Sequence, residues 1–338
     1  MDSQPVLIVG AGLAGLSAAL HLVEQRDAAG NAITVVEAAR SPGGRLATRQ
    51  IGPATLDLGA QFFTVRSAEL QARVDDWLTR GVVEEWCRGF AVVDGYPRYR
   101  AVGGMQGLAR HLRQQLEANG VTVVTGQRVS ALIPGPEAWT ASYDGATREP
   151  DDASAAIVTP PIPQSLELLR AGGVPLSAEH RVALDDFAYH RVLALLTVLD
   201  RSPELASPGA LQQPDDPTFS FVADNQVKGI SPVPAVTFHT AHGLSAELWP
   251  LSDLEVANRL LEPARQLVAP AQIVTHQVKR WRYSGPLTPY PEPCLTVANR
   301  PGPLVLAGDG FGPSKVEGAF LSGAAAAAQI VSSFSSGG

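Results

Sequence analysis

The sequence has few cysteines and no long apolar run. Its two cysteines, Cys87 and Cys294, are too few and too far apart in the chain for a disulfide framework or a metal cluster, so no metal site is predicted. No uninterrupted apolar stretch approaches the roughly 18 residues that a membrane helix needs. The N-terminal residues lack the basic segment of a signal peptide. These absences favour a cytoplasmic protein that does not associate with membranes.

Positive charge is also scarce. The 338 residues contain 26 Lys and Arg against 33 Asp and Glu, which gives a formal net charge of -7 at pH 7. This balance argues against general binding to nucleic acid or to anionic membranes. With 45% hydrophobic and 17% charged residues, the composition is that of a soluble globular protein. A chain of this length can form two cores, so we expect two domains.

The beginning of the chain has the pattern of a dinucleotide-binding unit. Residues 6–9 predict a buried parallel strand, and residues 13–25 predict the helix that follows it. Gly10, Gly12 and Gly15 lie between strand and helix in the spacing G-x-G-x-x-G. The first glycine allows a tight turn, the second lets the backbone approach a pyrophosphate, and the third lets the helix pack on the strand. The free N–H groups at the helix N-terminus suit a bound diphosphate.

A second predicted strand, Ile33 to Val36, ends in an acidic residue. Glu37 lies about 20 residues after the last glycine of the motif, where a carboxylate accepts hydrogen bonds from an adenosine ribose. Strand, glycines, helix, second strand and acid occur in the order that such a unit requires. We therefore predict dinucleotide binding, with an ordinary glycine-rich turn as the alternative.

The residues after this acid distinguish FAD from NAD. Residues 41–45 read SPGGR, and Gly43, Gly44 and Arg45 resemble the second signature of FAD enzymes in the amine oxidase and protoporphyrinogen oxidase superfamily. The resemblance implies that this loop crosses the diphosphate of FAD and that the arginine supports it. A Pro-Gly-Gly turn with a solvated arginine is the alternative.

Two later segments resemble the same superfamily. Residues 57–61, DLGAQ, match the segment that lies beside the flavin ring, which implies close approach of the backbone at Gly59 and Ala60 and a contact from Gln61. Together with GGRLATR before it, the run DLGAQFFTVR resembles renalase and its bacterial relatives, which are small FAD oxidoreductases. Residues 127–129 resemble the segment whose valine backbone meets the adenine; a purely structural role for Val129 is the alternative.

The last part of the chain gives a further match. Residues 304–331 predict a buried strand, a Gly-Asp-Gly turn and a helix that starts near Val316. In the family, the counterpart of Asp309 accepts hydrogen bonds from the ribityl hydroxyls, and the helix N-terminus stabilises negative charge on reduced flavin. Lys315 is expected to be solvated. The residues of this segment implied at FAD are Gly308, Asp309, Val316, Glu317 and Ala319.

Four residues are candidates for substrate contact. The strand around His239 resembles a renalase-family strand whose histidine faces the flavin, which makes it a candidate to hold substrate or tune proton transfer. His242 is expected on the other face of that strand, so the two do not suggest a metal site. Trp281 lies in a run that resembles the family's return strand and supplies an aromatic wall. Phe62 stands where relatives often carry tyrosine. Ordinary structural packing is the alternative for each, and the predicted catalytic set is Gln61, Phe62, His239 and Trp281.

The order of the segments predicts a discontinuous domain layout. An Asp94-Gly95 pair predicts a hairpin turn, residues 159–163 predict a break in regular structure, and residues 164–279 predict an antiparallel sheet with a covering helix. We expect a doubly wound, Rossmann-type α/β FAD-binding domain from residues 1–65, 100–162 and 280–332, an inserted α+β substrate domain from residues 66–99 and 163–279, and a flexible tail from residues 333–338.

The resemblance also implies a reaction. Renalase-like proteins hold FAD without a covalent bond, and the surroundings of Cys294 differ from the cysteine motif of covalently linked amine oxidases. The implied activity is oxidation of dihydronicotinamide isomers, 2- or 6-dihydro-NAD(P), to NAD(P)+ by hydride transfer to the flavin, with O2 reduced to hydrogen peroxide. The alternatives are a flavin amine oxidase acting on a small amine, a flavin-binding scaffold without turnover, and an NAD-dependent dehydrogenase. The expected partners are therefore a small-molecule substrate and O2, for a monomer or homodimer.

Overall fold

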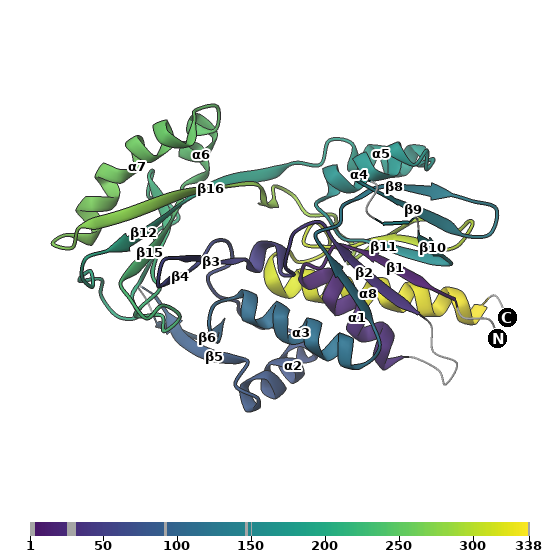
Figure 1. The fold of residues 1–338 in the computed structure, drawn as a ribbon, viewed down its shortest axis with the longest axis horizontal. Coiled ribbons are helices and arrows are strands. Elements are labelled where there is room, and N and C mark those ends of the chain that lie inside the picture. Colours follow the sequence, from purple (N-terminus) through teal and green to yellow (C-terminus); the bar gives the residue numbers. More distant parts are fainter. Residues whose placement is uncertain (1–3, 26–31, 91–92, 146–147, 150, 337–338) are drawn as a thin grey trace. The chain divides into compact units, whose positions relative to one another are not determined.

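The computed structural model describes residues 4–25, 32–90, 93–145, 148–149 and 151–336. Internal contacts divide the chain into two compact units, and Figure 1 shows the elements of both. Unit 1 comprises residues 1–44, 109–188 and 286–338, and unit 2 comprises residues 45–108 and 189–285. Each unit is therefore assembled from segments that lie far apart in the sequence.

Unit 1 contains a six-stranded sheet. Its strands are β1 (Val6–Val9), β2 (Ile33–Glu37), β7 (Thr122–Thr125), β11 (Ala155–Val158), β17 (Leu295–Ala298) and β18 (Leu304–Leu306). The strand order is β17-β18-β11-β1-β2-β7, with every pair parallel except β17 and β18. Strands β1 and β11 are buried along their whole length, as expected for a parallel sheet that is covered on both faces.

The helices of unit 1 are α1 (Leu13–Glu24), α4 (Ile162–Ala171), α5 (Ala178–Leu184) and α8 (Lys315–Ser336). Helices α1 and α8 lie side by side (Figure 1). The hydroxyl of Ser17 donates to the carbonyl oxygen of Phe320 at 2.7 Å. A Cβ on Gly323 would lie 2.0 Å from the carbonyl oxygen of Ala14, so only glycine permits this close approach of the two helix backbones.

A smaller sheet completes unit 1. It consists of β8 (Val129–Pro134), β9 (Trp139–Tyr143) and β10 (Asp151–Ala153) in antiparallel pairs. Helix α4 packs on β8. The backbone after this helix comes so close that a Cβ on Gly172 would lie 1.8 Å from the carbonyl oxygen of Leu132. Helix α3 (Gln106–Ala118) begins in unit 2 and continues into unit 1.

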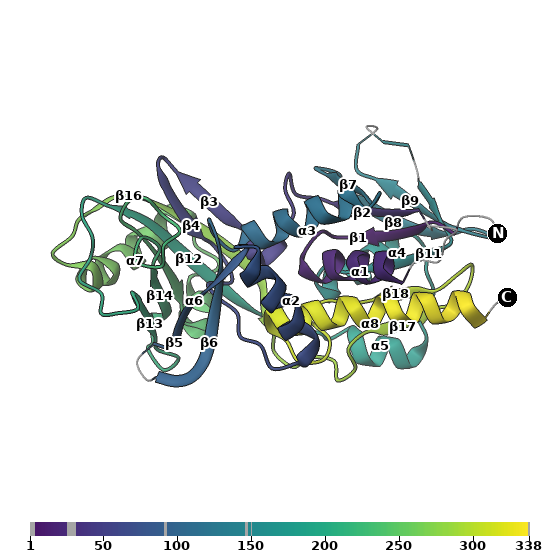
Figure 2. The same ribbon diagram turned by 90° about the horizontal axis from the view of Figure 1, so that it is seen from below.

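Unit 2 is built on a five-stranded sheet with the order β13-β14-β15-β12-β16. These strands are β12 (Tyr189–Leu199), β13 (Ala210–Gln212), β14 (Phe219–Asp224), β15 (Ala235–Thr240) and β16 (Ile273–Pro286). Helices α6 (His242–Leu248) and α7 (Asp253–Val268) cover one face (Figure 2). Alternate residues of β12 serve the two faces: Leu193 and Leu195 pack under the helices, whereas Ala194 and Leu196 face the other way.

That other face of the sheet is covered by a hairpin. The hairpin consists of β3 (Thr48–Ile51) and β4 (Ala54–Asp57). Leu56 of β4 and Leu58 just after it pack in one cluster with Ala194 and Leu196. A second hairpin, β5 (Val83–Gly89) with β6 (Val93–Ala101), and helix α2 (Ala68–Thr79) complete unit 2. Ser67 caps α2 by accepting a hydrogen bond from the N–H of Leu70.

The fold class is confirmed, because unit 1 is an α/β unit on a largely parallel sheet and unit 2 carries the antiparallel sheet with covering helices. The contact division differs from the expected boundaries in four segments. Residues 45–65 and 100–108 lie in unit 2, since the β3–β4 hairpin shares a core with β12. Residues 280–285 also lie in unit 2, since they belong to β16 of its sheet. Residues 163–188 lie in unit 1, since α4 packs on β8.

Several local expectations need correction. Gly89 of β5 pairs with Val93 of β6, so Asp94-Gly95 falls inside β6, and residues 91–92 lie outside the described part of the chain. Helix α4 begins at Ile162, inside the break expected at residues 159–163, because proline is compatible with the first turn of a helix. His242 begins α6 and is not part of a strand. The expected tail is helical as far as Ser336.

No helix of the described residues has both the length and the apolar character needed to cross a membrane. Within the same residues, no group of three or more His, Cys, Asp or Glu side chains is arranged to hold a metal ion.

Candidate cofactor and substrate site

The glycine motif of unit 1 forms a turn whose three glycines are used differently. Gly10 has a φ of +99°, and its N–H donates to the carbonyl oxygen of Val36 at 2.7 Å. A Cβ on Gly15 would lie 1.9 Å from the carbonyl oxygen of Gly10, whereas a Cβ on Gly12 would meet no protein atom within 4 Å. Gly10 and Gly15 therefore shape the turn, and Gly12 leaves open space at the start of α1.

This open space suits a diphosphate. Gly12 is the N-cap of α1 and gives no side-chain cap to the first turn, which also carries no acidic residue. Gly43 approaches from the second signature, with its N–H donating to the carbonyl oxygen of Ala11 at 2.8 Å and a bridge to Gly12. Both Gly43 (φ +126°) and Gly44 (φ +53°) adopt backbone conformations that favour glycine. The backbone N–H groups and the absence of side chains fit an anionic group at a helix N-terminus.

Glu37 lies at the end of β2 with both carboxylate oxygens oriented by the backbone. Oε2 accepts a hydrogen bond from the N–H of Ala11 at 2.8 Å, and Oε1 accepts one from the N–H of Ala39 at 2.7 Å. Each oxygen of a carboxylate can accept more than one hydrogen bond, so ribose hydroxyls can be added. The N–H of Gln127 donates to the carbonyl oxygen of Glu37, which places the segment before Val129, a buried residue at the start of β8, against the end of β2.

The segment after β18 brings the last candidate cofactor residues into unit 1. Gly308 has a φ of +134°, and its N–H donates to the hydroxyl of Ser322 at 2.8 Å. Asp309 next to it is buried. Helix α8 begins at Lys315, which is exposed and has a φ of 77°, an unusual value for a residue with a side chain. Val316, Glu317 and Ala319 in its first turns are partly exposed.

In unit 2, residues 57–61 form a segment that we call the Asp57–Gln61 strip. Its backbone is bound to Arg45, the last residue of the second signature: the N–H of Ala60 donates to the carbonyl oxygen of Arg45 at 2.9 Å. A Cβ on Gly59 would lie 2.3 Å from that same oxygen. The guanidinium of Arg45 donates to the carbonyl oxygens of Tyr283 (3.2 Å) and Ser284 (3.4 Å). Arg45 therefore ties the strip to β16.

His239 and Trp281 both point to the strip. His239 Nε2 lies 2.9 Å from the carbonyl oxygen of Leu58, and Trp281 Nε1 donates to the same oxygen at 2.9 Å. A carbonyl oxygen can only accept, so Nε2 of His239 carries the proton and Nδ1 does not. Burial lowers the pKa of His239 to about 4, and the ring is therefore neutral at physiological pH. The geometry makes both side chains supports of the strip.

The side-chain amide of Gln61 also forms hydrogen bonds with the backbone of the strip. Its Nε2 donates to the carbonyl oxygens of Asp57 (2.8 Å) and Gly59 (3.2 Å). Its Oε1 accepts a hydrogen bond from Lys228 Nζ at 3.2 Å. The side chain is buried. The amide of this predicted catalytic residue therefore folds back onto its own backbone.

Lys228 and Asp57 form a buried ion pair that the sequence did not reveal. Nζ lies 2.7 Å from Oδ2 of Asp57, and both side chains have an exposed fraction of 0%. Asn225 and Thr237 extend this network. The N–H of Asp57 donates to Oδ1 of Asn225 at 3.3 Å, Nδ2 of Asn225 donates to the hydroxyl of Thr237 at 3.0 Å, and that hydroxyl donates to the carbonyl oxygen of Asp57 at 3.1 Å. In sequence, Lys228 follows a polar run between two strands, which reads as an ordinary turn. No local pattern signals burial at this position.

Phe62 belongs to an aromatic cluster with Trp86, Phe90 and Phe221, which we call the aromatic cluster of unit 2. Phe62 lies 5.1 Å from Phe90 and 5.8 Å from Phe221 between ring centroids. Two cations already lie on these rings. Arg98 is 5.0 Å from the centre of Phe90, and Lys228 Nζ is 5.1 Å from the centre of Trp86.

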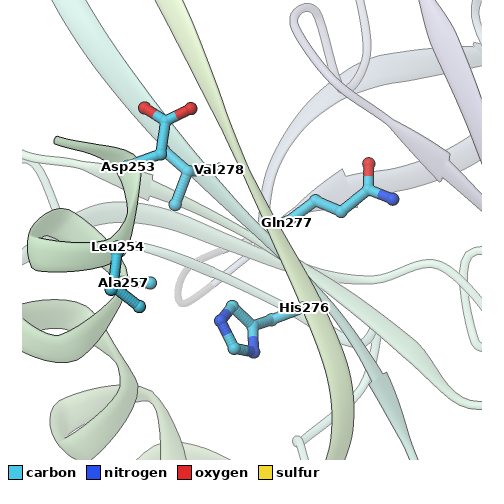
Figure 3. A pocket seen from close by; sticks show the side chains of 6 residues that line it. All are labelled: Asp253, Leu254, Ala257, His276, Gln277 and Val278. Carbon is cyan, nitrogen blue, oxygen red and sulfur yellow. The ribbon is translucent and has the colours of Figure 1, made fainter.

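A shallow pocket of unit 2 lies elsewhere, between the first turn of α7 and β16 (Figure 3). It has a volume of about 340 Å³, and Gln277 points away from the helix. The carboxylate of Asp253 at its edge already accepts a hydrogen bond from Arg280 at 2.7 Å. None of the predicted cofactor or substrate residues lines it. The residues around this pocket are Asp253, Leu254, Ala257, His276, Gln277 and Val278.

Comparisons with known proteins agree with this geometry. The family model described as flavin containing amine oxidoreductase matches residues 75–331, and the model of an NAD(P)-binding Rossmann-like domain matches residues 8–77. A phytoene dehydrogenase of Streptomyces griseus is 47% identical over 60 residues. This stretch is 18% of the chain and 11% of that protein, so the match spans only a small part of the curated relative.

Solved structures with the same fold cover nearly the whole chain. A protein from Exiguobacterium sp. 255-15 that is named a protoporphyrinogen oxidase has a TM-score of 0.73 at 13% identity, covering 98% of this chain and 99% of that one. A putrescine oxidase with bound putrescine has a TM-score of 0.71 at 16% identity, covering 98% and 99%. An oxidoreductase from Methanosarcina mazei has a TM-score of 0.64 at 16% identity, covering 95% and 99%. At these identities the likeness shows the fold.

The family model spans most of the chain, and the residues of unit 1 fit the dinucleotide that it implies. Open space at Gly12, N–H groups without a side-chain cap at α1 and an oriented Glu37 carboxylate fit a dinucleotide such as FAD. The chain therefore belongs to the flavin-containing amine oxidoreductase family and is a flavin-dependent oxidoreductase with FAD as its cofactor.

Proposed function

We propose that this protein is a renalase-type oxidase. In this proposal 2- or 6-dihydro-NAD(P) is oxidised to NAD(P)+ by hydride transfer to FAD, and O2 is reduced to hydrogen peroxide. The observation that carries the proposal is the charge on the aromatic cluster of unit 2. Arg98 lies over Phe62 and Phe90, and Lys228 lies over Trp86. The charge of Lys228 is balanced by Asp57, so the guanidinium of Arg98 is the charge that favours a neutral dihydropyridine ring with anionic phosphates and disfavours a cationic amine.

The proposed reaction needs no catalytic acid or base. A hydride leaves the dihydropyridine carbon with both bonding electrons, and the ring nitrogen lone pair completes an aromatic pyridinium. When bound, FAD would supply the hydride acceptor and the two-electron reductant of O2. Of the two hydrogens of the peroxide, one derives from the transferred hydride and one is a proton from solvent. His239 is neutral, and its Nε2–H group donates a hydrogen bond to the carbonyl oxygen of Leu58. In this proposal it supports the backbone and transfers no proton. The protein then supplies orientation and electrostatics.

The residues proposed to hold FAD come from the motifs described above. Burial raises the pKa of the Cys294 thiol to about 11, so it is not a thiolate at neutral pH, which supports attachment without a covalent bond. The same proposal takes the enzyme to be cytoplasmic and a monomer or homodimer. The proposed cofactor residues are Gly10, Gly12, Gly15, Glu37, Gly43, Gly44, Arg45, Gly59, Ala60, Gln61, Val129, Gly308, Asp309, Val316, Glu317 and Ala319.

An amine oxidase is the second candidate. The family description names amines, and a putrescine oxidase with bound putrescine shares the fold. Phe62 and Trp281 would then have to flank a neutral amine. This candidate differs from the first in the charge of the donor, because an amine is largely cationic in water, whereas a dinucleotide carries phosphates.

The visible spectrum of the purified holoprotein, followed without oxygen, tests the proposal. 6-Dihydro-NAD, ordinary NADH and a primary amine are added to separate samples. We expect the nicotinamide isomer alone to bleach the flavin absorption. On admission of air the yellow colour should return and hydrogen peroxide should form. Bleaching only by the amine would make the protein an amine oxidase. A flavin that no donor bleaches would favour the scaffold without turnover.

A further inference from the structure

Lys228 is the most enclosed cation of unit 2. Its side chain and that of Asp57 both have an exposed fraction of 0%, and the two charges lie 2.7 Å apart. The ammonium also donates to Gln61 Oε1 at 3.2 Å and lies over the ring of Trp86. A buried ion pair contributes little net stability relative to apolar side chains of the same volume. Its presence therefore calls for an explanation other than stability.

Asp57 connects this pair to three separate segments. Oδ1 accepts hydrogen bonds from the hydroxyl of Thr48 on β3 at 2.6 Å and from the N–H of Met105 before α3 at 2.7 Å. Lys228 approaches Oδ2 from the connection between β14 and β15. The carbonyl oxygen of Asp57 accepts from Gln61 and Thr237. The ion pair thus lies where hairpin, helix start and sheet connection meet, at the first residue of the Asp57–Gln61 strip.

The contacts of Lys228 fix both ends of the strip. One N–H bond of its ammonium goes to Asp57 and another goes to Gln61, four residues later. Because Oε1 of Gln61 faces the ammonium, its Nε2 faces the strip and donates to the carbonyl oxygens of Asp57 and Gly59. The backbone of Gly59 and Ala60 between them is held in one conformation.

We propose that Lys228 is a positioning residue for the flavin: by joining Asp57 to Gln61, it fixes the backbone of Gly59 and Ala60 in the conformation that receives the cofactor. The inference rests on the proposed cofactor role of these residues and is independent of which donor reduces the flavin. Lys228 touches neither the donor nor the reacting atoms in this role. It acts through the strip alone.

The charge of Lys228 depends on its neighbours. Burial is the main cause that lowers the pKa of Lys228, and the charge of Arg100 on β6 lowers it further. Asp57 raises it through charge and hydrogen bond. Arg100 is itself paired with Glu84 at 2.7 Å, and His239 on β15 faces the pair as a neutral ring. Asp57 is therefore the group that favours the charged ammonium, and its removal should lower the pKa of Lys228 further.

The test uses purified holoprotein and four variants: Lys228→Met, Asp57→Asn, the double variant with both changes, and Arg80→Met. The last removes an exposed ion pair of unit 2 (Arg80 to Asp76, 2.8 Å) and is the control. The measured quantities are the flavin absorption spectrum, the FAD dissociation constant and the flavin midpoint potential as a function of pH. None of them needs a donor, so the proposed donor and this inference can fail separately.

We expect Lys228→Met to change the flavin spectrum and to raise the FAD dissociation constant about tenfold, since one charge-assisted tie of the strip is lost. Asp57→Asn lowers the pKa of Lys228 further and should therefore add an inflection to the pH dependence of the potential, which the double variant lacks because it has no lysine at this position. Arg80→Met should behave like the unmodified protein. If the single variant does not fold, the neutral double variant should fold and still show the altered spectrum. An unchanged spectrum, affinity and potential in Lys228→Met or in the double variant would overturn the proposal.

Discussion

The Nε2–H group of His239 donates a hydrogen bond to the carbonyl oxygen of Leu58, with 2.9 Å between nitrogen and oxygen. Trp281 donates to the same atom from β16. One carbonyl of the Asp57–Gln61 strip thus receives two N–H groups from two different strands. The residues that the sequence marked as substrate contacts are, in their hydrogen bonds, supports of the backbone next to Gly59.

Removing the N–H of His239 should therefore weaken catalysis while FAD stays bound. For His239→Ala we expect the rate of flavin reduction by the donor to fall about tenfold, the loss of roughly one hydrogen bond of average strength. His239→Gln keeps an N–H donor of similar reach and should retain most of the rate. Stopped-flow reduction under anaerobic conditions measures both. Equal rates for the Ala variant and the unmodified protein would show that this hydrogen bond has no role in reduction.

The low pKa of His239 also predicts a pH dependence of stability. Its folded-state pKa is about 4, below the value of about 6.5 in an unfolded chain. The unfolded state therefore binds more protons between these values, and stability decreases as the pH falls below about 6.5. Between about pH 6.5 and pH 5 the loss from this one group should be about 1–2 kcal/mol. Thermal unfolding of the unmodified protein and of His239→Gln across this range tests the point, because the Gln variant should lose less.

Replacement by alanine should affect the stability of the apoprotein at only one of two glycines of the first motif. A Cβ on Gly15 would lie 1.9 Å from the carbonyl oxygen of Gly10, so Gly15→Ala should destabilise the apoprotein by several kcal/mol, on the order of 3. A Cβ on Gly12 meets nothing within 4 Å, and its φ of -70° is accessible to alanine. Gly12→Ala should leave the apoprotein stability unchanged.

The same Gly12→Ala variant should bind FAD at least about tenfold more weakly, because the methyl group occupies the space left for the diphosphate. Thermal unfolding of both apoproteins and fluorescence titration with FAD separate the two effects. Undiminished FAD affinity in Gly12→Ala would place the diphosphate elsewhere.

The contrast between the two units explains what sequence could and could not predict. The turn at Gly10, the helix after it and Glu37 at the end of β2 follow from contiguous patterns, and each was found. The pair of Asp57 and Lys228 joins residues that are 171 positions apart, and a lysine after a polar turn has no local signature of burial. The predicted roles of His239 and Trp281 rested on family likeness, which does not specify the oxygen that they contact.

Asp224 at the end of β14 gives a last test, on the segment that carries Lys228. Its Oδ1 accepts hydrogen bonds from the N–H groups of Gln226 (2.8 Å) and Val227 (3.2 Å), while Oδ2 is buried and has no hydrogen-bond partner among the described residues. Burial raises the pKa of Asp224, despite these two N–H groups, which lower it.

The pKa of Asp224 in the folded state lies above the unfolded value of about 3.9. Between these two pKa values the folded state binds more protons than the unfolded state, so stability decreases as the pH rises from the unfolded to the folded pKa. Asp224→Asn keeps the oxygen that caps the turn and removes the charge. We expect the variant to match the unmodified protein near pH 4 and to exceed its stability at neutral pH. Denaturant unfolding at both pH values measures the difference, and a difference that does not change with pH would show that Asp224 titrates as it does in the unfolded chain.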